Sequence, residues 1–206
     1  IPTQISGVQS QIFSKITLEN NYQLSCLGTK ISIGCAPLPS KTLPIIQKSF
    51  FEKTKEPNES GYIIFDSYYY DLPTLKRKPE SLGLFYESLR EQGINISNYA
   101  SGIFRYKSNI FIINLDQESL NDFPSSQAKP IYQSICLSLE YFCQTGPISE
   151  NEVHQTVFLL NTFKASKQYQ SLEPKNLGPL FRASMEVSMR CASPKLCVPY
   201  FILENQ

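Results

Sequence analysis

One segment constrains the fold of this chain more than any other: residues 99–115, which read YASGIFRYKSNIFIINL. Phe104 and Tyr106 flank Arg105, an alternation of apolar and polar residues that is typical of a half-buried strand. The Ser-Asn pair that follows can turn the chain, and the apolar run 110–115 suits a second, buried strand. Taken alone, the segment predicts a β-hairpin with Arg105 on its solvent-facing side.

The charge balance of the chain argues against a nucleic-acid partner, and its hydropathy argues against a membrane-spanning segment. Nineteen Lys and Arg residues stand against 18 Asp and Glu, a formal net charge of +1. A protein that neutralises phosphates usually carries a basic excess, so we expect no nucleic-acid partner. No apolar run approaches the roughly 18 residues that cross a bilayer, so we also expect no membrane span.

The inventory of ligand-forming residues predicts neither a metal nor a cofactor. The six cysteines form no CxxC pair and His154 is the only histidine, so a structural zinc site is not expected. The nine glycines form no phosphate-binding loop, which argues against a nucleotide bound by the chain itself. We interpret the cysteines as reduced, structural thiols of a cytoplasmic protein.

The chain changes character near residue 75. Residues 1–75 are rich in strand signals, with a hairpin expected in YQLSCLGTKISIGC (residues 22–35). The basic stretch TLKRKPES marks the boundary, and residues 76–206 carry helical patterns. Helices are expected within residues 78–93, 129–146, 149–166 and 174–190.

The third of these helices rests on a capping box, in which Ser149 and Glu152 bond each other's backbone. The fourth is expected to begin near Pro179. The predicted fold is therefore mainly α with a small β-rich N-terminal region. A single α+β domain is the alternative, because the run 110–115 favours strands.

Two later segments resemble the RhoGAP family of Rho GTPase-activating proteins. The first is YESLREQGINISNYASGIFR, a helix followed by a GIFR signature that places an arginine at residue 105. The second, residues 154–184, resembles the family's apolar helix followed by a segment that carries a functional asparagine. The resemblance covers about residues 79–187, and the matching residues are Gly102, Ile103, Phe104, Arg105, Leu172, Asn176, Leu177 and Phe181.

The resemblance implies a helical domain that binds a GTP-loaded Rho-family GTPase in signal transduction. Arg105 would be the arginine finger, a fork-shaped cation that stabilises the charge developing on the transferred phosphoryl group. Asn176 would anchor the interface, with Lys107 and Lys175 contributing to GTPase binding. Such a finger accelerates GTP hydrolysis by about 10³ to 10⁵. A degenerate, binding-only relative is the other form of this hypothesis.

Other interpretations stay open at this stage. Arg105 can be a plain hairpin residue, Asn176 can cap or turn a helix, and the whole chain can be a non-catalytic α+β interaction domain without a GTPase partner. His154 is the one residue that could act as base for a cysteine or serine nucleophile. That function requires such a side chain within hydrogen-bonding reach of its ring.

Overall fold

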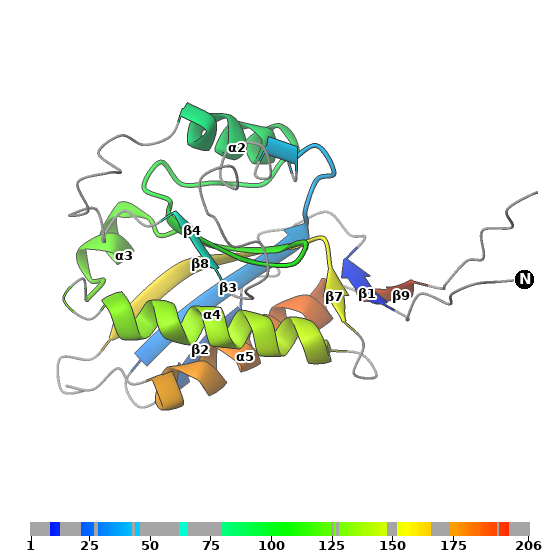
Figure 1. The fold of residues 1–206 in the computed structure, drawn as a ribbon. Helices are drawn as coiled ribbons and strands as arrows, with labels where there is room; N and C mark the ends of the chain where they lie inside the picture. Colours follow the sequence, from blue (N-terminus) through cyan, green and yellow to red (C-terminus); the bar gives the residue numbers. More distant parts are fainter. Residues whose placement is uncertain are drawn as a thin grey trace, which may run out of the picture.

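A six-stranded mixed sheet forms the middle of the molecule in the computed structural model (Figure 1). The structure describes residues 9–12, 22–26, 29–42, 44–45, 62–65, 80–124, 126, 128–147, 152–165, 174–192 and 194–197. In spatial order the strands are β2 (Tyr22–Cys26), β3 (Thr29–Pro37), β8 (Thr156–Ala165), β6 (Asn109–Ile113), β5 (Ser101–Tyr106) and β4 (Tyr62–Phe65). β6 and β8 run parallel, and the other neighbouring strands are antiparallel.

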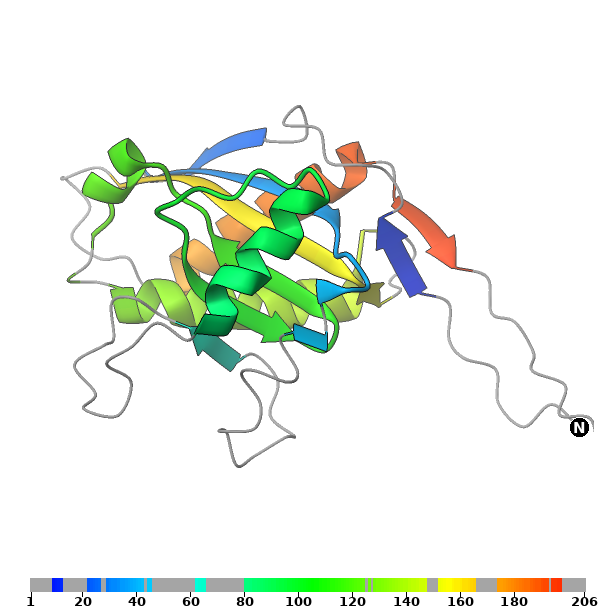
Figure 2. The same ribbon diagram turned by 90° about the horizontal axis from the view of Figure 1, so that it is seen from above.

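Helices cover both faces of this sheet. α4 (Ala128–Thr145) and α5 (Pro174–Cys191) lie side by side on one face, and α2 (Glu80–Glu91) crosses the other (Figures 1 and 2). The short α3 (Gln117–Asn121) begins where the Asp116 carboxylate accepts a hydrogen bond from the Ser119 amide at 2.7 Å. β7 (Val153–His154), β1 (Gln9–Ile12) and β9 (Pro194–Cys197) form a separate small sheet.

The mainly α, RhoGAP-like fold predicted from the sequence is wrong. The described residues contain nine strands and four helices, which give an α+β architecture, the alternative that the apolar run 110–115 favoured. The larger sheet also joins strands from both sides of residue 75, since β3 pairs with β8 along its length. β2 and β3 form the hairpin that was expected within residues 22–35.

The largest error concerns the helix expected within residues 149–166, which is instead β7 and β8. β8 lies between β3 and β6, and its side chains are buried in the hydrophobic cores on both faces of the sheet. Phe158 and Leu160 point into the core beneath α4 and α5, whereas Val157 and Leu159 belong to the core beneath α2. A central strand of this kind has a continuous apolar run, and its period cannot be told from that of a buried helix.

The GIFR signature lies in the first strand of the expected hairpin, now β5 paired with β6. Gly102 has a φ of +63° at an irregularity in the pairing, and a Cβ there would lie 2.8 Å from Ile113 Cδ1. Only glycine fits such a position without strain. Ile103 and Phe104 lie in the hydrophobic cores on opposite faces of the sheet. Packing therefore accounts for Gly102, Ile103 and Phe104, three of the four signature residues.

Three of the expected helices are confirmed. α2 ends where Gly93 adopts a φ of +79°, and α4 spans the second expected helix. α5 begins at Pro174, earlier than Pro179, which lies inside it. Pro179 is the sixth residue of α5, so it removes the helical hydrogen bond that an N–H at this position would donate to the Lys175 carbonyl.

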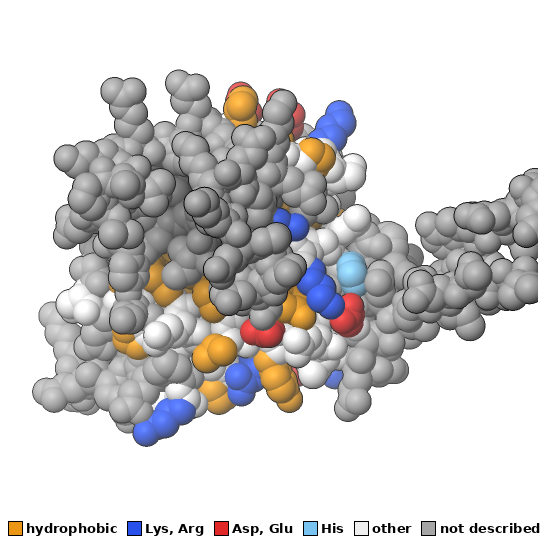
Figure 3. Space-filling view, in the orientation of Figure 1, with side chains coloured by type: hydrophobic (Ala, Val, Ile, Leu, Met, Phe, Trp, Pro, Cys, Tyr) orange, Lys and Arg blue, Asp and Glu red, His pale blue; other side chains and the backbone are white. Residues whose placement is uncertain are grey.

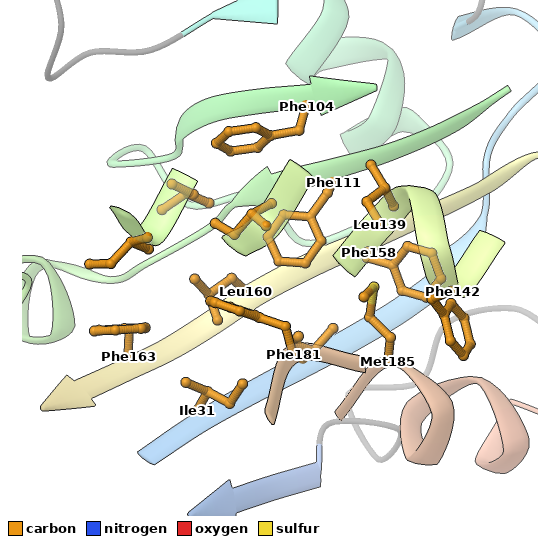
Figure 4. Packing of buried hydrophobic residues seen from close by; sticks show 14 of the residues in the cluster. Ile31, Phe104, Phe111, Leu139, Phe142, Phe158, Leu160, Phe163, Phe181 and Met185 are labelled. Carbon is orange, nitrogen blue, oxygen red and sulfur yellow. The ribbon is translucent and has the colours of Figure 1, made fainter. Parts of the chain in front are cut away.

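The core between the sheet and the pair α4–α5 is aromatic (Figure 4). Phe111 of β6 is fully buried and meets Phe104 and Phe181 edge to face, with ring centroids 6.1 Å apart in both pairs. Edge-to-face contacts add to the hydrophobic stabilisation of buried rings. Phe111 thereby connects the hairpin to α5.

Replacing Phe111 by alanine should lower the free energy of unfolding by about 3–5 kcal/mol, because a large cavity opens between β6 and α5. Urea unfolding followed by circular dichroism measures the loss. Leu137→Ala is the matched control, since that side chain is 59% exposed and should change stability by no more than about 0.5 kcal/mol. Equal losses in the two variants would contradict the burial described for β6.

Candidate functional site

Arg105, the predicted arginine finger, is a half-buried residue of β5. It pairs with Tyr62 of β4 on one side and with Ile110 of β6 on the other. Its Nε donates a hydrogen bond to the carbonyl oxygen of Lys107, and burial lowers the pKa of its guanidinium. The side chain therefore braces the turn of its own hairpin.

Asn176 and Lys175 lie at the opposite end of the sheet from Arg105. Phe181, five residues after Asn176, stacks on Phe163 near the end of β8, with centroids 6.4 Å apart. The later turns of α5 run back along the sheet toward the start of β8 (Figure 1). Arg105 lies at that start, because its partner on β6 aligns with Val157. The two RhoGAP-like segments are thus not brought together.

Lys107, the other predicted GTPase contact, takes part in a charged cluster at the β5–β6 turn. Its ammonium group contacts Glu152 at 2.7 Å, and that hydrogen bond is the main reason why the pKa of the Glu152 carboxyl is lowered. The second carboxylate oxygen of Glu152 lies 3.4 Å from His154 Nε2, without hydrogen-bond alignment. On the other side of the ring, His154 Nδ1 lies 3.3 Å from Ser108 Oγ.

This arrangement places a serine within reach of the sole histidine and a carboxylate on its other nitrogen. The distance requirement of a serine nucleophile is therefore met. However, Ser108 Oγ also accepts the backbone N–H of Gln155 at 3.0 Å, and the neighbouring N–H of Thr156 is bound by Asn109. Both backbone donors are thus used within the protein and are not free to stabilise an oxyanion.

Three cysteines of the described residues, Cys35, Cys136 and Cys143, are poor nucleophiles. Burial raises the pKa of the Cys35 and Cys136 thiols to about 12, and it raises the pKa of Cys143 further. A thiol with a raised pKa carries little thiolate at neutral pH and is unreactive. Cys35, Cys136, Cys143 and Cys191 are free, and the interpretation of the six cysteines as reduced, structural thiols stays a prediction.

The hydrogen bonds of the β5–β6 turn explain what the cluster does. Lys107 and Gln155 have φ values of +51° and +49°, so each segment turns through a conformation that is costly for a residue with a side chain. Asn109, fully buried, donates to the Val153 carbonyl at 2.6 Å and accepts from the Thr156 amide at 3.2 Å. The side chains of Ser108 and Asn109 thereby fasten the turn to β7 and β8, which is a structural role.

A second surface, which we call the α4–α5 surface, consists of Leu137, Tyr141 and Arg182. Leu137 and Tyr141 occupy successive turns of α4 and are 59% and 56% exposed. The Arg182 guanidinium of α5 lies over the Tyr141 ring, 5.0 Å from its centroid. Hydrophobic side chains gather on this side of the molecule beside charged ones (Figure 3).

None of these three residues was predicted from the sequence as a site residue. Ile131, Ile135, Leu139 and Phe142 form the apolar stripe of α4 that faces the core, and all four are buried. Leu137 and Tyr141 lie outside that stripe and are four residues apart, so they share another face of the helix. This spacing is visible in the sequence and indicates a second apolar strip. The position of Arg182 over Tyr141 depends on how α4 and α5 pack, which the sequence does not show.

Two further properties of the residues that the structure describes concern metal ligands and membrane spans. No group of three or more His, Cys, Asp or Glu side chains in these ranges could hold a metal ion. Among the helices of the described ranges, none has the length and apolarity that a bilayer crossing requires.

No family model matches the chain, and no curated protein matches it. The assignment of a function therefore depends on the geometry of this chain.

Replacing Asn109 by alanine should lower the free energy of unfolding by about 2–4 kcal/mol. The Val153 carbonyl and the Thr156 amide would each lose a buried partner, at about 1–3 kcal/mol per group. Thermal or urea unfolding measures the loss against Asn95→Ala, whose side chain is exposed. A loss no larger than that of the control would show that Asn109 does not fasten the turn.

Removing the ammonium group in Lys107→Met should raise the pKa of the Glu152 carboxyl toward its ordinary value. Because folding lowers the pKa of this carboxyl, its ionised form stabilises the folded state at pH values above the unfolded-state pKa of about 4.3. This contribution is lost as the pH falls through the folded-state pKa. Both side chains are more than 40% exposed, so the contribution is small. A carbon-detected NMR titration of Glu152 in both forms measures the shift, and an unchanged midpoint would contradict the contact.

Proposed function

We propose that this chain is an α+β protein-interaction domain that contacts a partner through its α4–α5 surface. The observation that carries the proposal is the exposure of Leu137 and Tyr141 on adjacent turns of one helix. Isolated exposed apolar residues are ordinary, but an aliphatic and an aromatic side chain at a spacing of four form one continuous contact area. Full burial of each would contribute about 1.5–3 kcal/mol.

The way that Tyr141 is held also supports this proposal. Arg182 covers part of the ring, so the aromatic side chain is fixed in place before a partner arrives. Side chains that are already ordered lose less conformational entropy on binding. Tyrosine and arginine are, in addition, enriched among the residues that dominate interface energies.

The GTPase-activating function, with a Rho-family GTPase as partner, stays a prediction. It is supported by the order of the RhoGAP-like segments in the sequence. Two findings count against it: Arg105 bonds the turn of its own hairpin, and Asn176 lies at the other end of the sheet. We therefore favour an interaction domain that acts without a catalytic arginine.

A cytoplasmic location is part of the same proposal. The four free cysteines of the described residues support it, because thiols persist in reducing compartments.

Site-specific photo-cross-linking tests the α4–α5 surface. A benzoylphenylalanine placed at Leu137 should cross-link a specific protein in extracts of the cells that express the chain. The same group at Leu84 of α2 is the matched control, because both leucines are 59% exposed. Excess unlabelled wild-type chain should suppress the cross-link, whereas excess Leu137→Ser/Tyr141→Ser double variant should not.

Equal cross-linking from the two positions, or equal competition by the double variant, would overturn the proposal. The double variant removes only exposed apolar surface, so its melting temperature should match that of the wild type. That measurement separates loss of binding from loss of fold.

Single-turnover GTP hydrolysis by Rho-family GTPases tests the other prediction. On our proposal the wild-type chain and Arg105→Ala both leave the intrinsic rate unchanged. A working arginine finger would instead give an acceleration of about 10³ or more that disappears in the variant. Such a result would restore the GTPase-activating function in spite of the fold.

A further inference from the structure

Arg182 differs from the other described arginines in what its guanidinium contacts. Arg190 pairs with Glu186 at 2.9 Å, and Arg90 donates to the Ile96 carbonyl. Arg182 is half-buried against the Tyr141 ring, and no acceptor among the described residues bonds its N–H groups. Glu186, one turn further along α5, would be its natural helical partner but pairs with Arg190 instead.

The backbone of α5 makes room for this position. A Cβ at Gly178 would lie 3.2 Å from Arg182 Nη1, closer than an undisturbed contact allows. The guanidinium therefore lies along α5 beside Gly178 while it covers Tyr141 of α4. The two helices are close here, since Ser138 Oγ donates to the Gly178 carbonyl at 3.2 Å.

The chemistry of a guanidinium over an aromatic ring indicates what it would bind. The contact with the ring uses the positive charge and none of the five N–H donors, which stay available for an acceptor. Such donors match the two oxygens of a carboxylate, and the pairing is strongest when apolar neighbours exclude water. Leu137, which lies one turn before Tyr141 on the exposed side of α4, supplies an apolar neighbour.

We infer that the α4–α5 surface binds an acidic amphipathic helix of a partner protein. A carboxylate of that helix would bond Arg182, and an apolar side chain about one turn away would cover Leu137 and Tyr141. This inference rests on the proposed function and adds the chemistry of the partner. The charge complementarity comes from Arg182 itself, a cation to which the described residues offer no carboxylate within ion-pair distance.

Two synthetic helical peptides provide the test. One carries Leu and Glu one turn apart in an alanine-rich sequence, and the other has Gln in place of every Glu. Binding is measured by fluorescence anisotropy and is located by ¹⁵N-resolved NMR shifts. The wild-type chain should bind the Glu peptide at least about tenfold more tightly than the Gln peptide, and shifts should cluster on α4 and α5.

Variants then separate charge, position and apolar contact. Arg182→Gln should lose about tenfold in affinity for the Glu peptide and leave the weak binding of the Gln peptide unchanged. Gly178→Ala keeps the charge but displaces the guanidinium, so it should lose affinity several-fold while the melting temperature stays the same or rises. Leu84→Ser should bind as the wild type does.

Three results would overturn the inference: equal binding of the two peptides, full affinity in Arg182→Gln, or binding that survives Leu137→Ser and so reflects charge alone. If cross-linking at Leu137 succeeds while the peptides give one of these results, the proposed interaction domain is supported and the acidic helix as its partner is contradicted. If both fail, both proposals fall. Dimerisation that Leu137→Ser abolishes in sedimentation velocity would assign the surface to a second copy of the chain and contradict the acidic helix.

Discussion

The burial of β8 on both faces is the constraint on which the rest of this structure depends. The strand lies between β3 and β6, and its side chains alternate between two separate hydrophobic cores. Each core needs its own cover, which α2 provides on one face and the pair α4–α5 on the other. The parallel pairing with β6 also fixes the hairpin of β5 and β6, because the register of β6 against β8 sets where the turn falls.

The candidate surfaces follow from this arrangement. At the start of β8, Ser108 and Asn109 use their polar groups to hold the β5–β6 turn against β7 and β8, which leaves little chemistry for a substrate. On the α4–α5 side, the close contact at Gly178 and Ser138 brings Arg182 over Tyr141. The binding surface that we propose therefore arises from helix packing, whereas Arg105 contacts the turn of its own hairpin.

The sequence could predict the elements whose signals are local. The end of α2 at Gly93 and the β5–β6 hairpin each depend on neighbouring residues, and both are confirmed. β8 could not be recognised in this way, because the apolar run around Phe158 suits a buried helix as well as a central strand. The GIFR motif shows the same difficulty for function: the irregular pairing of β5 with β6 requires Gly102, so the fold by itself accounts for this glycine. The contact between Arg182 and Tyr141 joins residues 41 positions apart in sequence and depends on tertiary packing.

The most direct test of this account is the backbone conformation of residues 153–165, measured by NMR. A central strand predicts NOEs from Leu159 to Ile112 of β6 and to Gly34 of β3, together with slow amide exchange at Phe158 and Leu160. The RhoGAP-like alternative predicts a helix here, with strong sequential amide NOEs and contacts between residues three apart. That helical pattern would contradict the sheet, the two cores and the α4–α5 surface that depends on them.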